Sequence, residues 1–147
     1  MNDDDFQKRL AQLRRYFTDN VPHNRALGLE IVDLGPGRAR FRLPYQQKLV
    51  GNPEHGILHG GAITTLIDAA CGGAVFMALD KPMTIATLDL RIDYLRAAEP
   101  PREVIASAEC FRVTKQVAFV RAVAFHERES DPIAAAAGSF MLGTRSG

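Results

Sequence analysis

The hydrophobic and polar positions of the chain follow two periods, and the first part of the chain opens with the helical one. Residues 3–18 place apolar side chains between charged ones at helical spacing, which predicts a short amphipathic helix on the outside of the molecule. These apolar residues are Phe6, Leu10, Leu13 and Phe17. The segment VPHNRALG breaks the pattern. Residues 29–35 and 38–45 then alternate on either side of a Gly-Pro-Gly turn, which predicts a β-hairpin.

The most apolar stretch, residues 60–79, predicts a helix that is surrounded by protein on most sides. Apolar pairs recur every four residues, namely Ala62/Ile63, Leu66/Ile67, Ala70/Cys71, Ala74/Val75 and Ala78/Leu79. The segment LDKP ends the run with a turn and a proline. Gly72 and Gly73 interrupt the other face, and each costs about 1 kcal/mol relative to alanine in a helix interior. We therefore expect another element to pack very close to that face.

The second half of the chain follows the period of a strand. Residues 84–95 alternate between an apolar and a polar set. The apolar set is Ala86, Leu88, Leu90, Ile92 and Tyr94, and the polar set is Thr87, Asp89, Arg91 and Asp93. Residues 103–114, 116–127 and 132–142 continue the pattern, with short turn-forming segments between them. Such short connections predict an antiparallel meander of adjacent strands.

These elements fit together as one α+β fold. A sheet curled around a single central helix would bury that helix and leave the outer face of the sheet in water. This is the hot-dog architecture, an antiparallel curved sheet around one long helix, here with an additional N-terminal helix. Alanines in the strands would let the sheet approach the helix closely, namely Ala106, Ala108, Ala122, Ala124 and residues 134–137. We expect residues 1–20 to form the N-terminal helix and residues 21–147 the hot-dog domain.

Composition and charge argue against several kinds of partner and cellular location. The formal net charge is +1, and the charged residues are scattered without blocks of like sign, which gives no argument for nucleic acid or an anionic membrane surface. The start MNDDDFQKRL lacks the features of a secretory signal. No window reaches about 18 uninterrupted apolar residues. Cys71 and Cys110 have no paired spacing, which indicates buried free thiols in a reducing cytoplasm.

Asp68 is the one carboxylate inside the apolar run. A buried carboxylate without a cation partner is a candidate general base or nucleophile. The alternative is an aspartate that faces solvent or bonds to Thr64 or Thr65 one turn earlier. Apolar neighbours on both sides of Asp68 favour the first interpretation.

The start of the same helix is the second candidate feature. LHGG places Gly60 and Gly61 at the first helical turn, where free N–H groups and the positive end of the helix dipole can hold an oxyanion or a polarised carbonyl. The alternative is a glycine turn that only joins the loop to the helix. A lone histidine such as His59 at a helix entrance is more often a capping or packing residue than a catalyst.

Gly60 and Asp68 are eight residues apart, which is roughly 12 Å along a helix axis. They cannot both touch one reacting carbon, because each contact requires about 3 Å. If both act on a single carbonyl, they must come from different subunits. Apolar surface left at the rim of one small sheet also predicts a dimer, with a sheet that continues across the two subunits.

GNPEHGILHGGAITTLIDAACGGAV followed by ATLDLRIDYLRAAEP resembles the acyl-CoA thioesterases of the hot-dog fold. The resemblance is to the PaaI-like branch of the 4-hydroxybenzoyl-CoA thioesterase superfamily, and it covers about residues 27–142. It implies hydrolysis of acyl-CoA by a homodimer, which is expected to assemble further into a homotetramer. It also implies no metal and no cofactor, since CoA is part of the substrate.

The resemblance implies roles for the catalytic candidates. Gly60 would donate its N–H to the thioester carbonyl. His59 would mainly order the preceding loop, with contact to the carbonyl as its second role. Asp68 of the partner subunit would activate water or act as the nucleophile. Thr87 would position the water, and Asn52 would assist at the carbonyl. Asn52 stands seven residues before His59, one more than in many family members, so this loop is one residue longer.

The resemblance also implies substrate-binding residues. Gly61 and Thr65 would contact the substrate near the helix start. The candidates for the pantetheine and phosphate groups of CoA are Tyr94, Arg96, Arg112, Thr114 and Lys115. An apolar tunnel would hold a medium-chain or aromatic acyl group, lined by Val75, Phe76, Leu79, Met83 and the strand residues opposite.

Two other functions stay open. A hot-dog hydratase of enoyl thioesters pairs an acid with a histidine on the same carbon, and His59 and Asp68 are poorly spaced for that within one chain. A non-catalytic acyl-CoA-binding module of the kind found in transcription regulators carries a DNA-binding helical domain and a defective acid. This chain shows neither of those features in the sequence given.

Overall fold

The computed structural model describes residues 2–143, so residues 1 and 144–147 of the two expected regions lie outside it. The N-terminal helix α1 (Asp3–Leu13) is confirmed, and it continues as a π-helix, η1 (Arg14–Asp19). The expected break after it is instead a short helix, α2 (Pro22–Leu27). Proline suits the first position of a helix, and Gly28 ends α2 in the left-handed region at φ 72°.

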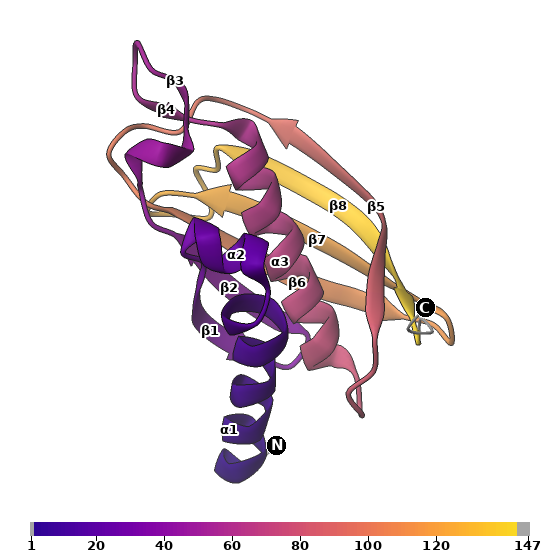
Figure 1. The fold of residues 1–147 in the computed structure, drawn as a ribbon. Helices are drawn as coiled ribbons and strands as arrows, with labels where there is room; N and C mark the ends of the chain where they lie inside the picture. Colours follow the sequence, from indigo (N-terminus) through magenta and orange to yellow (C-terminus); the bar gives the residue numbers. More distant parts are fainter. Residues whose placement is uncertain (1, 144–147) are drawn as a thin grey trace.

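A six-stranded antiparallel sheet forms the body of the molecule (Figure 1). The predicted hairpin is confirmed as β1 (Glu30–Gly35) and β2 (Arg38–Leu43). The four later strands are β5 (Ile85–Tyr94), β6 (Val104–Val113), β7 (Val117–Phe125) and β8 (Ala134–Leu142). The sheet order is β1-β2-β6-β7-β8-β5. The predicted meander is therefore wrong for β5, which pairs with β8 at the edge, while β6 pairs with β2.

The long helix α3 (Gly60–Ala78) lies against the sheet, as predicted (Figure 1). Most of the strand alanines proposed to face it are buried, among them Ala106, Ala122 and Ala134. The expected close packing at the two glycines is also present. A Cβ on Gly73 would lie 2.9 Å from the Phe41 ring, and a Cβ on Gly72 would lie 2.7 Å from the Phe17 ring. The predicted hot-dog architecture is thus confirmed.

The side chain of Arg9 in α1 forms hydrogen bonds with the C-terminal end of α3. The guanidinium of Arg9 donates hydrogen bonds to the carbonyls of Phe76, Leu79 and Asp80 at 2.8–3.0 Å. These carbonyls lie at the C-terminal end of α3, where the helix dipole is negative and carbonyls lack helical partners. Arg9 therefore caps the central helix from outside.

By length and composition alone, α3 is apolar enough to cross a membrane, with a mean hydropathy of 1.5. That window is 72% buried inside the fold, and the core helix of a soluble protein has the same composition.

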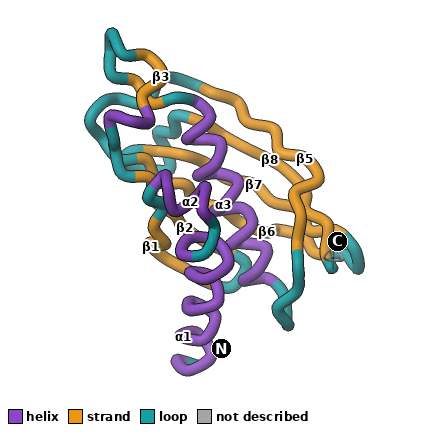
Figure 2. Tube along the Cα trace, viewed as in Figure 1, coloured by secondary structure: helices purple, strands orange, loops and turns teal. Residues whose placement is uncertain are grey.

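The loop before α3 contains a small hairpin that the sequence pattern did not predict. β3 (Val50–Asn52) pairs with β4 (Ile57–Leu58) in a separate two-stranded sheet. The hairpin extends beyond the main sheet beside the start of α3 (Figure 2). Gly51 lets it pass close to the helix, because a Cβ there would lie 2.8 Å from the Cα of His59.

The predicted alternation of β5 is wrong at its beginning. A β-bulge lies between Thr87 and Asp89, and it inserts Leu88 as an extra residue. The phase of the strand shifts there, so that Ala86 and Leu88 are exposed while Leu90 and Ile92 pack against the core. Thr87, expected on the outer face, turns toward α3 as a result.

Candidate active site

The candidate site lies where α3 faces the edge strand β5. Two residues one turn apart on α3, Thr64 and Asp68, contact β5 near its end and near its start. The hydroxyls of Thr64 and Tyr94 lie 2.7 Å apart, and the hydroxyl of Thr87 donates to the carboxylate of Asp68 at 2.8 Å. Asp68 is half-buried in the single chain, not buried as expected. The apolar residues on both sides of Asp68 in the sequence are buried, whereas the carboxylate itself is partly exposed where α3 faces β5.

The start of α3 presents one unused donor. The Nδ1 atom of His59, the N-cap residue, accepts a hydrogen bond from the N–H of Gly61 at 2.8 Å. The N–H of Ala62 donates to the His59 carbonyl at 3.0 Å. Within residues 2–143, no acceptor is found for the N–H of Gly60. His59 is thus a capping residue, and the Gly60 N–H remains available at the positive end of the helix dipole.

The carbonyls of the first turn are held in place by side chains. The hydroxyls of Tyr94 and Thr64 both donate to the Gly60 carbonyl, at 2.7 and 3.0 Å. Thr65 donates to the Gly61 carbonyl at 3.1 Å, and its hydroxyl lies 3.0 Å from Nε2 of His23. Tyr94, expected at the CoA moiety, therefore lies at the start of α3 and orients Gly60.

The contact of His23 with Thr65 could not be predicted from the sequence, because His23 belongs to α2, 42 residues before Thr65. A polar residue in a short, exposed helix carries no pattern that marks a distant contact.

Asn52 is placed in the small hairpin. Its side-chain oxygen accepts a hydrogen bond from the N–H of His55 at 3.3 Å. This is a local turn contact, and Asn52 is exposed. The described contacts of the Asn52 side chain therefore join it to its own hairpin and not to the start of α3.

The residues expected to bind CoA lie at two ends of the sheet within one chain. Arg96 follows β5. Its guanidinium lies 3.3 Å from the carboxylate of Asp131 and donates a hydrogen bond to the Asp131 carbonyl at 3.0 Å. Thr114 lies at the opposite end, in the β6–β7 turn, where its hydroxyl donates to the Val117 carbonyl. Arg112 and Lys115 are beside it and exposed. One chain therefore does not gather these cations into a single phosphate site.

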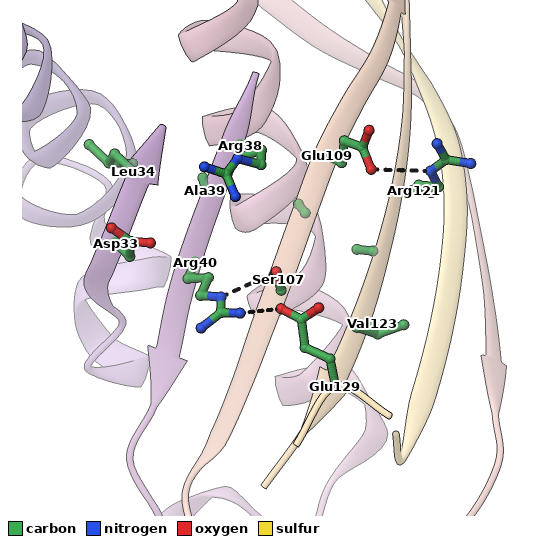
Figure 3. Close-up of a pocket in the computed structure, with 12 residues that line it drawn as sticks. Asp33, Leu34, Arg38, Ala39, Arg40, Ser107, Glu109, Arg121, Val123 and Glu129 are labelled. Atoms are coloured by element: carbon green, nitrogen blue, oxygen red, sulfur yellow. Dashed lines mark hydrogen bonds and ion pairs between the residues drawn. The ribbon is translucent and has the colours of Figure 1, made fainter. Parts of the chain in front are cut away.

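A pocket of about 510 Å³ lies on the face of the sheet away from α3 (Figure 3). Its charged side chains largely neutralise one another, with Arg40 paired to Glu129 and Arg121 to Glu109. Hydrogen bonding from Ser107, and then from Arg40, lowers the pKa of Glu129. Since these charges are already compensated, this pocket offers less to an anionic ligand than its arginines suggest.

The expected acyl tunnel is only partly found. Phe76 and Met83 line an apolar pocket of about 440 Å³ beside η1. Val75 and Leu79 do not line it, because both are buried in the core. Within residues 2–143, no group of three His, Cys, Asp or Glu side chains is arranged to hold a metal ion.

Known proteins are similar to this chain in sequence and in fold. Residues 55–133 match the thioesterase superfamily. The medium/long-chain acyl-CoA thioesterase YigI of Escherichia coli is 33% identical over 150 residues, covering 93% of this chain and 96% of that protein. A crystal structure of a Pseudomonas aeruginosa protein superposes with a TM-score of 0.82 at 43% identity, covering 90% of this chain and 98% of that one.

A mutant structure of the phenylacetic acid degradation protein PaaI from Thermus thermophilus gives a TM-score of 0.71 at 26% identity. It covers 82% of this chain and 98% of that one. The family match spans more than half of the chain, and the match to YigI spans almost all of it. On this evidence, the chain belongs to the thioesterase superfamily.

Proposed function

We propose that this protein hydrolyses acyl-CoA thioesters, with Asp68 and Gly60 as the groups that act on the thioester. The observation that carries the proposal is the Thr87–Asp68 hydrogen bond of 2.8 Å on the open face of α3. A carboxylate held by a hydroxyl in a half-buried position is suited to activate water or to attack a carbonyl. The match to YigI supports acyl-CoA as the substrate class.

The reaction needs a base and an oxyanion donor. Asp68 takes the proton of a water molecule held by Thr87, and the hydroxide attacks the carbonyl carbon. Alternatively, Asp68 attacks directly and water hydrolyses the resulting anhydride. In both routes the carbonyl oxygen gains negative charge, which the Gly60 N–H stabilises. The C–S bond breaks, CoA leaves as the thiolate and is protonated, and the acid is released.

Two subunits are needed to assemble these groups. Gly60 and Asp68 are eight residues apart on one helix, roughly 12 Å along its axis. Strand β5 ends the sheet beside this site and carries exposed Leu88, and exposed Leu95 follows the strand directly. Long apolar edge strands favour pairing with another chain. We infer a homodimer in which Gly60 of one subunit faces Asp68 of the other, and a homotetramer built from two such dimers.

The remaining expectations belong to the same proposal. The reaction requires no cofactor, because acid–base chemistry and a backbone donor suffice for thioester hydrolysis. Two free cysteines, Cys71 and Cys110, agree with a reducing cytoplasm, where CoA thioesters are made and consumed.

The test is release of free thiol from a panel of acyl-CoA thioesters. We expect Asp68→Asn to lower kcat by about 10²–10⁴-fold, because the neutral amide can neither take a proton nor attack the carbonyl. Asp33→Asn is the matched control, since Asp33 is an exposed aspartate on β1, in the outer-face pocket. Full turnover by Asp68→Asn would refute the site. No thiol release by the wild type would favour a binding module, and hydration of enoyl-CoA would indicate a hydratase.

A further inference from the structure

An apolar pocket of about 440 Å³ lies between η1, the end of α3 and the start of β5. Its walls include Tyr16, Phe17, Phe76, Pro82, Met83 and Ile85. The lining contains no charged side chain, whereas the outer-face pocket carries six. The volume falls within the range of about 300–1,000 Å³ that is usual for small-molecule sites.

The π-helix builds one side of this pocket. The consecutive residues Tyr16 and Phe17 both reach Phe76, with ring centroids 6.2 and 6.3 Å apart. Phe17 also meets Phe41 in an edge-to-face contact at 6.3 Å. Phe17 is thereby held against the core, while Tyr16 stays 54% exposed at the pocket rim.

The pocket begins one helical turn from the candidate carboxylate. Gly72 lies under it, where an added Cβ would be 2.7 Å from the Phe17 ring and 3.7 Å from Ile85. Gly72 is four residues after Asp68, or about 6 Å further along the helix. Ile85 is two residues before Thr87, the partner of Asp68. The pocket walls Phe17 and Ile85 therefore border the same α3–β5 contact as the proposed reacting groups.

We propose that this pocket receives the distal part of an unbranched aliphatic acyl chain, and that η1 and Met83 set the chain-length preference. The proposal rests on the acyl-CoA thioesterase activity proposed above. An acetyl group at Asp68 does not extend one helical turn, and an aryl ring joined directly to the carbonyl stays beside Thr87. A charged chain end would lose its water against a lining that carries no charged partner.

The preference for acyl-chain length can be measured through kcat/KM. Each methylene that enters the pocket is expected to raise kcat/KM about fourfold, because burying one CH₂ is worth about 0.8 kcal/mol. The increase should begin only for chains that pass Ile85 and should level off when the pocket is full. Short acyl groups should show little dependence on length.

The test fills the pocket with one substitution, Met83→Trp. Met83 lies in the loop before β5 and is 42% exposed, so the fold should tolerate the larger side chain. We expect the ratio of kcat/KM for decanoyl-CoA to that for butyryl-CoA to fall about tenfold, the value of roughly two buried methylenes. Met141→Trp is the matched control, because Met141 is 39% exposed on β8 and does not line the pocket.

The same variants give a readout without turnover. The chain contains no tryptophan, so each variant carries a single fluorophore. The non-hydrolysable thioether S-decyl-CoA should shift the emission of Met83→Trp to shorter wavelength and leave that of Met141→Trp unchanged. S-ethyl-CoA should change neither. If Met83→Trp fails to fold, Met83→Ala tests the same wall and should lower the decanoyl-to-butyryl ratio about two- to fourfold.

The outcomes separate the two proposals. A wild type that releases thiol, with the same chain-length profile in Met83→Trp and Met141→Trp, would overturn the pocket assignment and leave the thioesterase intact. A benzoyl-CoA preference abolished by Met83→Trp would overturn the aliphatic assignment. A wild type without thiol release would overturn the enzyme. A shift by S-decyl-CoA in Met83→Trp would even then support the pocket.

Discussion

At the scale of single residues, a β-bulge decides which side chain of β5 contacts Asp68. Asp68 and Gly60 are the proposed reacting groups, and the sequence singles them out because their residue types are unusual for an apolar helix. Thr87 was implicated only by resemblance, since its alternation placed it on the outer face. A bulge at Leu88 turns Thr87 toward Asp68, and bulges of this kind often redirect a side chain beside a site. No periodic pattern announces such a local insertion.

The Gly60 N–H can be tested by removing it alone. Proline suits the first turn of a helix, and His59 before it has φ −61° and ψ 134°, a conformation that proline accepts. We expect the melting temperature of Gly60→Pro to equal that of the wild type. Its kcat should fall about 10²–10³-fold, the usual cost of losing one oxyanion donor. Gly60→Ala is the control that keeps the N–H. Its Cβ would meet Tyr94 only at 3.5 Å, so equal losses in both variants would point to steric blocking instead.

Cys71 predicts how stability changes in alkali. Burial, followed by the charge of Asp68, raises the pKa of Cys71 from 9.0 to about 12. Between these values the folded chain keeps the thiol proton that the unfolded chain loses. The stabilisation is complete below pH 9 and is lost as the pH rises toward 12, by up to about 1.4 kcal/mol per pH unit.

We expect the free energy of unfolding of the wild type to fall relative to that of Cys71→Ala over this window. Urea denaturation of both proteins at pH 8, 9, 10 and 11 measures the difference. If the difference in free energy of unfolding between the two proteins does not change with pH, the raised pKa of Cys71 is contradicted.

At the scale of elements, the hydrophobic periodicity of the sequence predicted which segments are helices and which are strands. The lengths of the connections predicted less well which strands pair with each other. The helix over residues 60–79 and the later strands were found because long periodic segments leave few alternatives. The pairing of β5 with β8 was missed, since short connections favour adjacent pairing. The chain uses its β5–β6 connection, residues 95–103, to cross the sheet instead. This crossing leaves β5 at the edge, beside the candidate site.

The contact between α3 and the sheet can be tested at the paired glycines. Alanine gains about 1 kcal/mol over glycine in a helix interior, but at Gly73 its Cβ would meet buried Phe41 at 2.9 Å and Ala39 at 3.3 Å. Overpacking of this kind costs about 1–3 kcal/mol. We expect Gly73→Ala to lower the free energy of unfolding in urea, and Gly72→Ala to lower it less, because Phe17 is only partly buried whereas Phe41 is fully buried. A Gly73→Ala variant more stable than the wild type would show that the sheet does not pack so closely.

At the scale of the whole molecule, one chain explains the fold, and we propose that a second chain completes the site. The apolar face of α3 is covered by its own sheet, while the face with Thr64 and Asp68 opens toward the edge strand β5. Helix geometry could predict from the sequence that Gly60 and Asp68 do not meet within one chain. The hydrogen bonds that orient Gly60 could not be predicted, because Tyr94 joins it from 34 residues away. The central claim is therefore that two subunits share each site.

Mixing two inactive variants tests this claim most directly. Asp68→Asn supplies an intact Gly60, and Gly60→Pro supplies an intact Asp68. After unfolding and refolding together in equal amounts, half of the dimers should contain one chain of each kind, with one of their two sites intact. We predict that thiol release recovers to about a quarter of the wild-type rate, while each variant refolded alone stays inactive. No recovery, with heterodimers demonstrated by differently tagged chains, would contradict the shared site.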